Sequence, residues 1–67
     1  MLYSVVLSFA STLPDTEDFL FHCQTKADNE NHAYLLSMTF LEAEKDLSFF
    51  ILKFKSIQEV EKEWLIA

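Results

Sequence analysis

The chain has 67 residues, of which 51% are hydrophobic and 15% aromatic, and its formal net charge is −6, with neither arginine nor glycine. The apolar content excludes a disordered chain, because burying that much apolar surface offsets the entropy lost on ordering. The acidic balance and the lack of arginine argue against direct nucleic-acid binding, and the lack of glycine excludes glycine-rich phosphate loops and the dinucleotide-binding fingerprint.

The first predicted element is a strand over Leu2–Phe9. Its odd-numbered positions carry large apolar side chains and its even-numbered positions include two serines, which is the alternation of a strand with one buried face. The segment is apolar enough to suggest a signal sequence, but no basic residue precedes it and Ser4 and Ser8 interrupt it. A strand is therefore the better interpretation.

The second predicted element is a helix that begins near Pro14. Proline is tolerated in the first turn of a helix, and the acids Asp15, Glu17 and Asp18 would lie at the positive end of the helix dipole. The buried side of this helix would carry Phe19, Leu20, Cys23 and Ala27. Residues 19–25 also alternate as a strand would, so the sequence leaves helix and strand open there.

Two further strands are predicted after a polar turn at residues 27–32. Residues 33–43 and residues 47–55 both alternate in the strand manner, and residues 44–46 make a short connection between them. The register that keeps one apolar inner face places Phe40 opposite Phe50, Met38 opposite Leu52 and Leu36 opposite Phe54. On the other face it places Leu41 opposite Phe49 and Thr39 opposite Ile51.

The last predicted element is a helix from residue 57 to the end of the sequence. Ser56 and Glu59 form the S-x-x-E pattern that caps helix N-termini. Apolar residues follow at helical spacing, namely Ile57, Val60, Trp64 and Leu65. This pattern indicates a helix with one face packed on the sheet.

Together these elements predict a single α+β domain over residues 1–67. The domain would have a three-stranded antiparallel sheet with two helices on one face, in the order β-α-β-β-α. This order is similar to a ferredoxin-like layout that lacks its last strand, a likeness of shape that implies no activity. A chain this short buries only about 60% of the surface that its unfolded form exposes, so a partner subunit would add to a marginal core.

The residues capable of catalysis or metal binding form no recognisable motif. A structural zinc site needs four convergent ligands at short spacing, which His22, Cys23 and His32 do not provide. Cys23 falls on the apolar side with Phe19, which favours core packing over nucleophilic chemistry. The sequence therefore predicts no catalysis, no metal and no cofactor; a small dimeric enzyme with a cleft near His22, His32 or Tyr34 is the alternative.

The single cysteine and the hydropathy of the sequence predict the cellular compartment of the protein. One cysteine cannot form an internal disulfide, on which small secreted domains usually rely, and this predicts a reducing, cytoplasmic compartment. No run approaches the roughly 18 apolar residues of a membrane-spanning helix, so no membrane association is expected. The acidic residues are spread along the chain as ordinary solubility requires, and an acidic inhibitor or nucleic-acid mimic that binds a basic groove on an enzyme is a second alternative.

The open face of the predicted sheet carries more apolar residues than a solvated face should. A sheet covered by helices on one side is expected to be polar on the other. Six apolar residues would nevertheless project there: Leu2, Val6, Leu35, Leu41, Phe49 and Ile51. Such a patch usually marks an interaction site. The sequence thus predicts a protein-protein interaction module that forms a homodimer through this face, with another protein as the alternative partner.

Overall fold

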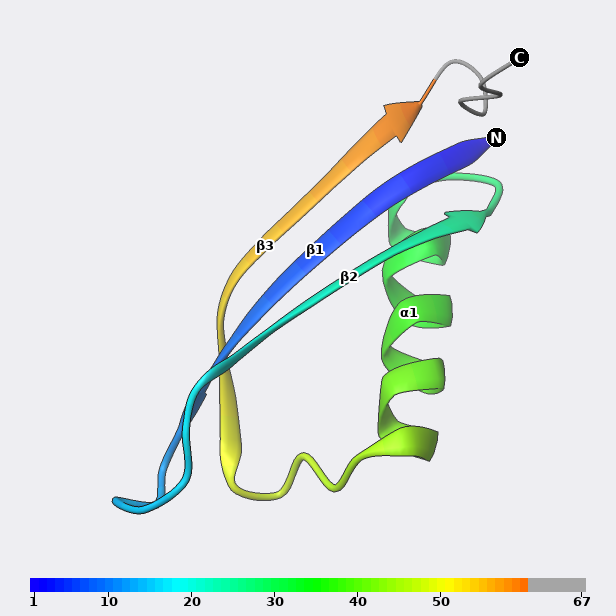
Figure 1. The fold of residues 1–67 in the computed structure, drawn as a ribbon. Coiled ribbons are helices and arrows are strands. Elements are labelled where there is room, and N and C mark those ends of the chain that lie inside the picture. Colours follow the sequence, from blue (N-terminus) through cyan, green and yellow to red (C-terminus); the bar gives the residue numbers. More distant parts are fainter. Residues whose placement is uncertain (61–67) are drawn as a thin grey trace, which may run out of the picture.

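The chain forms one antiparallel sheet with a helix packed against one side of it (Figure 1). The computed structural model describes residues 1–60. In this range the elements are strand β1 (Leu2–Ser11), strand β2 (Phe19–Lys26), helix α1 (Glu30–Glu44) and strand β3 (Phe50–Val60). The fold is α+β with a three-stranded antiparallel sheet, as predicted, but residues 1–60 contain one helix and follow the order β-β-α-β. The predicted order β-α-β-β-α, and with it the ferredoxin-like layout, is therefore wrong.

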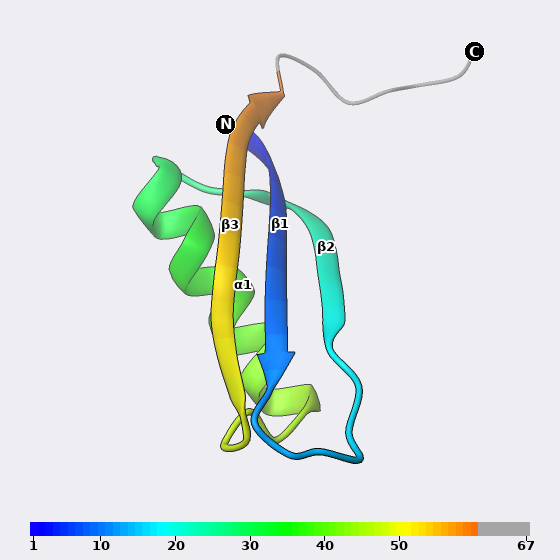
Figure 2. The ribbon, with the colours of Figure 1, turned by 90° about the vertical axis from the view of Figure 1, so that its left-hand side faces the viewer.

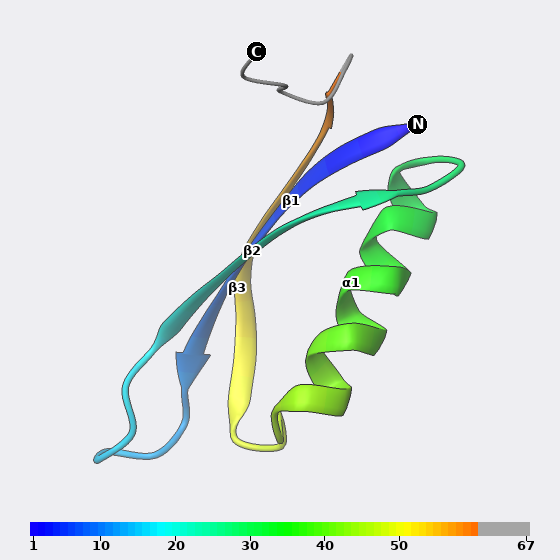
Figure 3. The same cartoon turned by 45° about the vertical axis from the view of Figure 1, so that its right-hand side comes forward.

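β1 is the central strand and pairs antiparallel with β2 on one side and with β3 on the other. Since both neighbours run antiparallel to β1, they run parallel to each other, and α1 is the crossover that joins them. Figure 2 looks onto the sheet with α1 behind it. In Figure 3 the helix lies on one side of the sheet, and no other described element covers the opposite side. We call this open side the outer face.

The core lies between β1 and α1. The inward-facing side chains of β1 are all buried: Tyr3, Val5, Leu7 and Phe9. The helix meets them with Ala33, Ser37 and Leu41, which follow one another at intervals of about one turn. The predicted first strand and its buried face are confirmed.

Three aromatic rings and one lysine close the core at the end where α1 leads into β3. The Phe19 ring stacks on Phe9 at a centroid distance of 4.9 Å and meets Phe50 edge-on at the same distance. The Lys45 ammonium lies 4.7 Å from the centroid of Phe19 and 5.2 Å from that of Phe50. This cation–π contact covers rings that would otherwise meet water.

The segment 33–43 is helical, and the prediction of a strand there was wrong. The Asn29 side chain caps the helix by accepting a hydrogen bond from the backbone N–H of His32 at 2.9 Å, and Glu30 places an acid in the first turn. The register that paired this segment with residues 47–55 is wrong for the same reason. The large apolar residues that suggested alternation lie on several sides of the helix.

Residues 19–26 form a strand, which is the alternative that the sequence left open, and the predicted helix from Pro14 is wrong. A hairpin loop at residues 12–18 joins β1 to β2. The Asp18 carboxylate closes this loop by accepting a hydrogen bond from the Ser11 N–H at 2.8 Å. The acids that suggested a helix dipole therefore belong to a turn.

β3 extends beyond the predicted third strand and includes the start of the predicted last helix. Ser56 lies opposite Val6 and Glu59 opposite Tyr3, so the S-x-x-E pattern falls within a strand. A helix over residues 57–60 is therefore wrong. The rest of that predicted helix lies outside the described residues.

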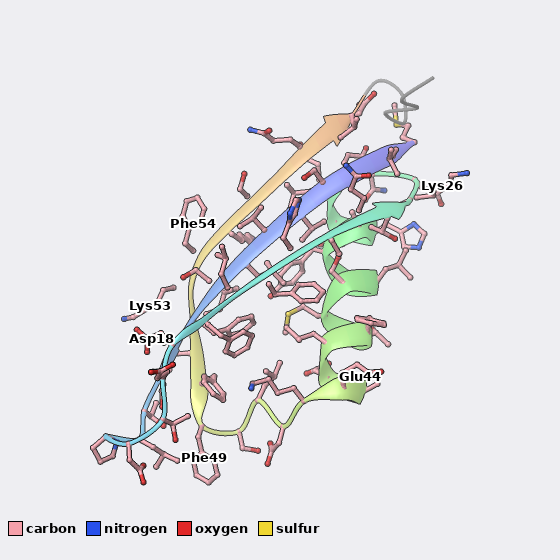
Figure 4. All side chains as sticks on the ribbon, in the orientation of Figure 1. Asp18, Lys26, Glu44, Phe49, Lys53 and Phe54 are labelled. Carbon is pink, nitrogen blue, oxygen red and sulfur yellow. The ribbon has the colours of Figure 1, made fainter. Side chains whose placement is uncertain are left out.

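A β-bulge in β3 changes the face on which one of its side chains lies. Ser8 pairs with Phe54 and Phe9 pairs with Leu52, which leaves Lys53 as the extra residue. Strict alternation from Leu52 would direct Phe54 toward the helix. The bulge instead places Phe54 opposite Ser8 on the outer face, and in Figure 4 its ring points away from α1.

Candidate protein-interaction site

The outer face carries a group of exposed apolar side chains near the hairpin end of the sheet. Leu20 and Phe54 lie on either side of Ser8, from β2 and β3, and Ile51 pairs with Ala10 one step along β1. Leu20 is 67% exposed, Phe54 57% and Ile51 51%. We call Leu20, Ile51 and Phe54 the outer patch.

Apart from Leu2, Val6, Ala10 and Val60, the remaining outer-face side chains of the described strands are polar, and none of these strands places a carboxylate there. Toward the far end of β1 it presents Ser4, His22, Gln24 and Gln58, and the Ser4 hydroxyl lies 3.0 Å from Nε2 of His22. Lys26 marks that end of β2. An acidic protein therefore has one face on which the described strands place no acid.

The structure divides the interface residues that the sequence predicted. On the outer face or at its margin are Leu2, Val6 and Ile51. Elsewhere are Phe49, exposed in the turn before β3, Leu35, exposed on α1, and Leu41, buried in the core. Half of the predicted set is thus brought together on one side of the sheet, and the helical residues are not.

Leu20 and Phe54 belong to the patch but were missed from the sequence. Leu20 alternates with Phe19 and Phe21, so the strand alternative for residues 19–25 contained the signal. Phe54 is different, because only the bulge at Lys53 turns it outward. The sequence around Lys53 contains no glycine or other residue that would predict a bulge.

A second apolar surface lies between β2 and the helix. The rings of Phe40 on α1 and Phe21 on β2 are 6.2 Å apart, and Phe40 remains exposed. Beside them is a depression of about 260 Å³ lined by Cys23, Gln24, Thr25, Leu36, Ser37 and Phe40. We call Leu36 and Phe40 the helix flank.

Cys23, which lines this depression, contacts a buried hydroxyl. Its Sγ lies 3.3 Å from Oγ of Ser37, and Ser37 donates a hydrogen bond to the carbonyl of Ala33 at 2.8 Å. The Ser37 hydroxyl is thereby satisfied within the helix. Cys23 is half-buried against the core, in keeping with a packing role.

The three side chains considered for catalysis do not share a cleft. His22 lies on the outer face, whereas His32 and Tyr34 lie on the helix on the other side of the sheet. Nδ1 of His32 accepts a hydrogen bond from the Asp28 N–H at 3.1 Å. Tyr34 lies under Lys55, whose ammonium is 4.6 Å from the ring centroid.

Two ionisable groups away from the outer patch have shifted pKa values. Burial raises the pKa of Tyr3, and nearby carboxylates, of which Glu59 contributes most, raise it further. The pKa of Asp46 is lowered because Ser48 donates two hydrogen bonds to one carboxylate oxygen, from its hydroxyl at 2.6 Å and its N–H at 2.9 Å. Neither group adds charge to the outer face.

Neither the described residues nor the known proteins compared with the chain give a separate indication of function. Residues 1–60 contain no group of three or more His, Cys, Asp or Glu side chains that could hold a metal ion. Within the same range no helix has the length and apolar character needed to cross a membrane. Comparisons with protein-family models, curated proteins and solved structures found no match to the chain. The function is therefore argued from the surfaces described above.

Proposed function

We propose that this protein is a small protein-protein interaction module that forms a homodimer through the outer face of its sheet. The observation that supports the proposal is the outer patch, in which three large apolar side chains are each more than half exposed on one side of the sheet. Apolar residues grouped on an uncovered face typically mark a binding surface. Full burial of such a side chain is worth about 1.5–3 kcal/mol, and the exposed part of each of these three would contribute its share of that to association.

The distribution of charge favours a second copy as the occupant. Two chains with a formal charge of −6 repel each other, so the surface through which they meet should be the one with the fewest acids. The described strands place no acid on the outer face, while the hairpin loop and the helix carry several. A two-fold dimer formed face to face keeps those acids at its periphery.

The two alternatives raised by the sequence have less support. An enzyme with a cleft near His22, His32 or Tyr34 would need these side chains to converge, and the sheet lies between the first and the other two. A nucleic-acid mimic would use an acidic surface, and the acids of residues 1–60 belong mainly to turns and helix ends. Neither alternative explains the outer patch.

A charge placed in the outer patch tests the proposal. Phe54→Lys should be tolerated in an isolated chain, because the position faces water, but it should weaken a dimer that buries it. We expect the dissociation constant, measured by sedimentation velocity over a range of concentrations, to rise at least about tenfold, which corresponds to 1.4 kcal/mol. Ile51→Lys should act in the same direction.

Leu35→Lys is the matched control. Leu35 is also an apolar residue of about half exposure, but it lies on α1 and is separated from the sheet-facing Ser37 by roughly half a turn. This variant should associate as the wild type does. A wild type that is monomeric at all concentrations, or a Phe54→Lys variant with unchanged association, would rule out the outer face as a self-interface.

A further inference from the structure

Within residues 1–60, β2 is an edge strand with a regular backbone and no strand paired to its outward side. Met1 and Ala27 exchange two backbone hydrogen bonds, Ala27 N–H to the Met1 carbonyl at 2.8 Å and the Met1 ammonium to the Ala27 carbonyl at 3.1 Å. The ladder between β1 and β2 continues from there without a register shift. Because bonded positions alternate in an antiparallel pair, the odd-numbered residues of β2 bond to β1. The even-numbered residues direct their N–H and C=O groups outward: Leu20, His22, Gln24 and Lys26.

The opposite edge of the sheet is protected in ways that β2 is not. β3 carries the bulge at Lys53, a lysine at position 55 that folds over Tyr34, and an acid at Glu59. Bulges and charged side chains are the usual means by which edge strands avoid pairing with other chains. Between Phe19 and Thr25, β2 has no bulge and no lysine, aspartate or glutamate. The two edges therefore differ in their readiness to accept another strand.

We propose that β2 pairs antiparallel with β2 of a second copy, about a two-fold axis that passes through His22. The pairing joins the two sheets into one continuous sheet with both helices on the same face. It uses the strand edge and leaves the outer patch open, so it is a second interface that does not depend on the one proposed above.

The axis at His22 follows from the faces and the charges of β2. A two-fold axis keeps inner side chains opposite inner ones only when it passes through a residue, since a slip of one position would exchange the faces. Centred on His22, the pair places Lys26 opposite the partner's Asp18, the residue that precedes β2, and Figure 4 shows these two side chains at opposite ends of the strand. Opposite charges across a strand pair are stabilising.

Neighbouring positions of the axis lose this complementarity. An axis at Phe21 would set Lys26 opposite the partner's Thr16, which carries no charge. An axis at Cys23 would set it opposite the partner's Leu20. The register centred on His22 is therefore the one that the sequence of β2 favours.

The helix flank adds an apolar contact between the two copies to the strand pairing. Leu36 and Phe40 project beside β2, and Phe40 contacts the Phe21 ring. In the register centred on His22, Phe21 lies opposite the partner's Cys23 on the inner face, so each flank approaches the flank of the other copy. Leu36 and Phe40, which are exposed in the single chain, then have an apolar surface to pack against.

Proline at Gln24 tests the strand pairing. The Gln24 N–H points outward, so Gln24→Pro removes a hydrogen bond from the dimer without removing one from the ladder with β1. The control is Glu59→Pro, where the N–H points outward from the other edge of the sheet. We expect Gln24→Pro to raise the dissociation constant at least about tenfold in sedimentation velocity, and Glu59→Pro to leave it unchanged. Circular dichroism of both variants checks that the fold is retained.

Combining variants separates this interface from the outer face. If both interfaces form, the wild type assembles beyond a dimer, Phe54→Lys and Gln24→Pro are each dimers, and the double variant is a monomer. Wild-type association of Gln24→Pro would overturn the strand pairing and leave the outer face standing. Wild-type association of Phe54→Lys would overturn the outer-face interface and leave the strand pairing standing.

Spin labels test the register even if proline disturbs folding. In a Phe54→Lys, Cys23→Ser background, a label at His22→Cys should lie close to its counterpart, since bonded residues have Cα atoms about 5.5 Å apart. A label at Lys26→Cys should lie about 27 Å from its counterpart, because eight residues of strand separate them. A Lys26→Cys separation shorter than that of His22→Cys, or no short distance at His22→Cys, would overturn the pairing.

Discussion

We expect the stability of the core at alkaline pH to depend on the protonation state of Tyr3. Its ring is buried and its hydroxyl donates to Sδ of Met1 at 3.5 Å, and its pKa is raised because the phenolate would lose solvation and meet nearby carboxylates. A raised pKa in the folded state means that this contribution to stability is complete below the ordinary value of about 10 and is lost as pH rises through the raised value.

We therefore expect the urea midpoint of the wild type to fall more steeply between about pH 9 and pH 11 than that of Tyr3→Phe, which keeps the ring. Circular dichroism follows the unfolding at each pH. Tyr34→Phe, at a half-buried position on α1, removes the other tyrosine hydroxyl and serves as the control. Equal pH profiles for the wild type and Tyr3→Phe would show that the Tyr3 hydroxyl does not govern the alkaline limit.

Individual residues also show where inference from sequence succeeded. The inward residues of β1 were assigned to the buried face because alternation over eight positions is hard to produce in another way. Phe54 was assigned to the wrong face because one inserted residue, Lys53, reverses the alternation after it. The alternation of residues 33–43 predicts Leu41 on the outer face of a strand, but the segment is helical and Leu41 is a core residue.

At the scale of elements, α1 was missed because its buried positions carry little apolar bulk. Ala33 and Ser37 face the sheet, while Leu35, Leu36 and Phe40 are exposed, so the usual apolar stripe of a packed helix is weak. The better signal was local, namely Asn29 as a cap. The S-x-x-E pattern at Ser56 shows the converse, since a capping sequence does not make a helix where a strand partner is in reach.

The orientation of α1 can be tested by changing the side-chain volume at its buried and at its exposed positions. Leu41→Ala should lower the free energy of unfolding by about 2–5 kcal/mol because it empties a core position, whereas Leu35→Ala should change it by less than about 0.5 kcal/mol. Ala33→Leu should destabilise by about 1–3 kcal/mol, because there is no room for a larger side chain against β1. Urea unfolding measures all three. A cost for Leu35→Ala equal to that of Leu41→Ala would mean that the helix packs through a different side.

For the whole molecule, the sequence was sufficient for the class of the fold and insufficient for its connections. The sheet needed three strands with one buried face, and both β1 and the strand alternative for residues 19–25 provided the right alternation. Local patterns do not determine which segment forms the crossover helix. The sequence of α1 alternates as a strand would, and that of β3 contains a helix-capping pattern, so packing in the whole fold decides between them. The outer patch likewise depends on the assembled sheet, because its three members come from β2 and β3 and meet only across β1.

Hydrogen exchange distinguishes the two edges of the assembled sheet. β1 is the central strand, with a hydrogen-bonded neighbour on each side, so its amides should exchange slowest. In the single chain, the outward amides of Leu20, His22 and Gln24 on β2 and of Ile57 and Glu59 on β3 should exchange fast. When the concentration is raised above the association midpoint, strand pairing at β2 should slow the first group and leave the second fast, which amide exchange followed by NMR resolves residue by residue. Slowing of both groups to the same degree, or of the β3 group alone, would be incompatible with an assembly in which β2 supplies the edge contact, because β3 retains its bulge and charges in every copy.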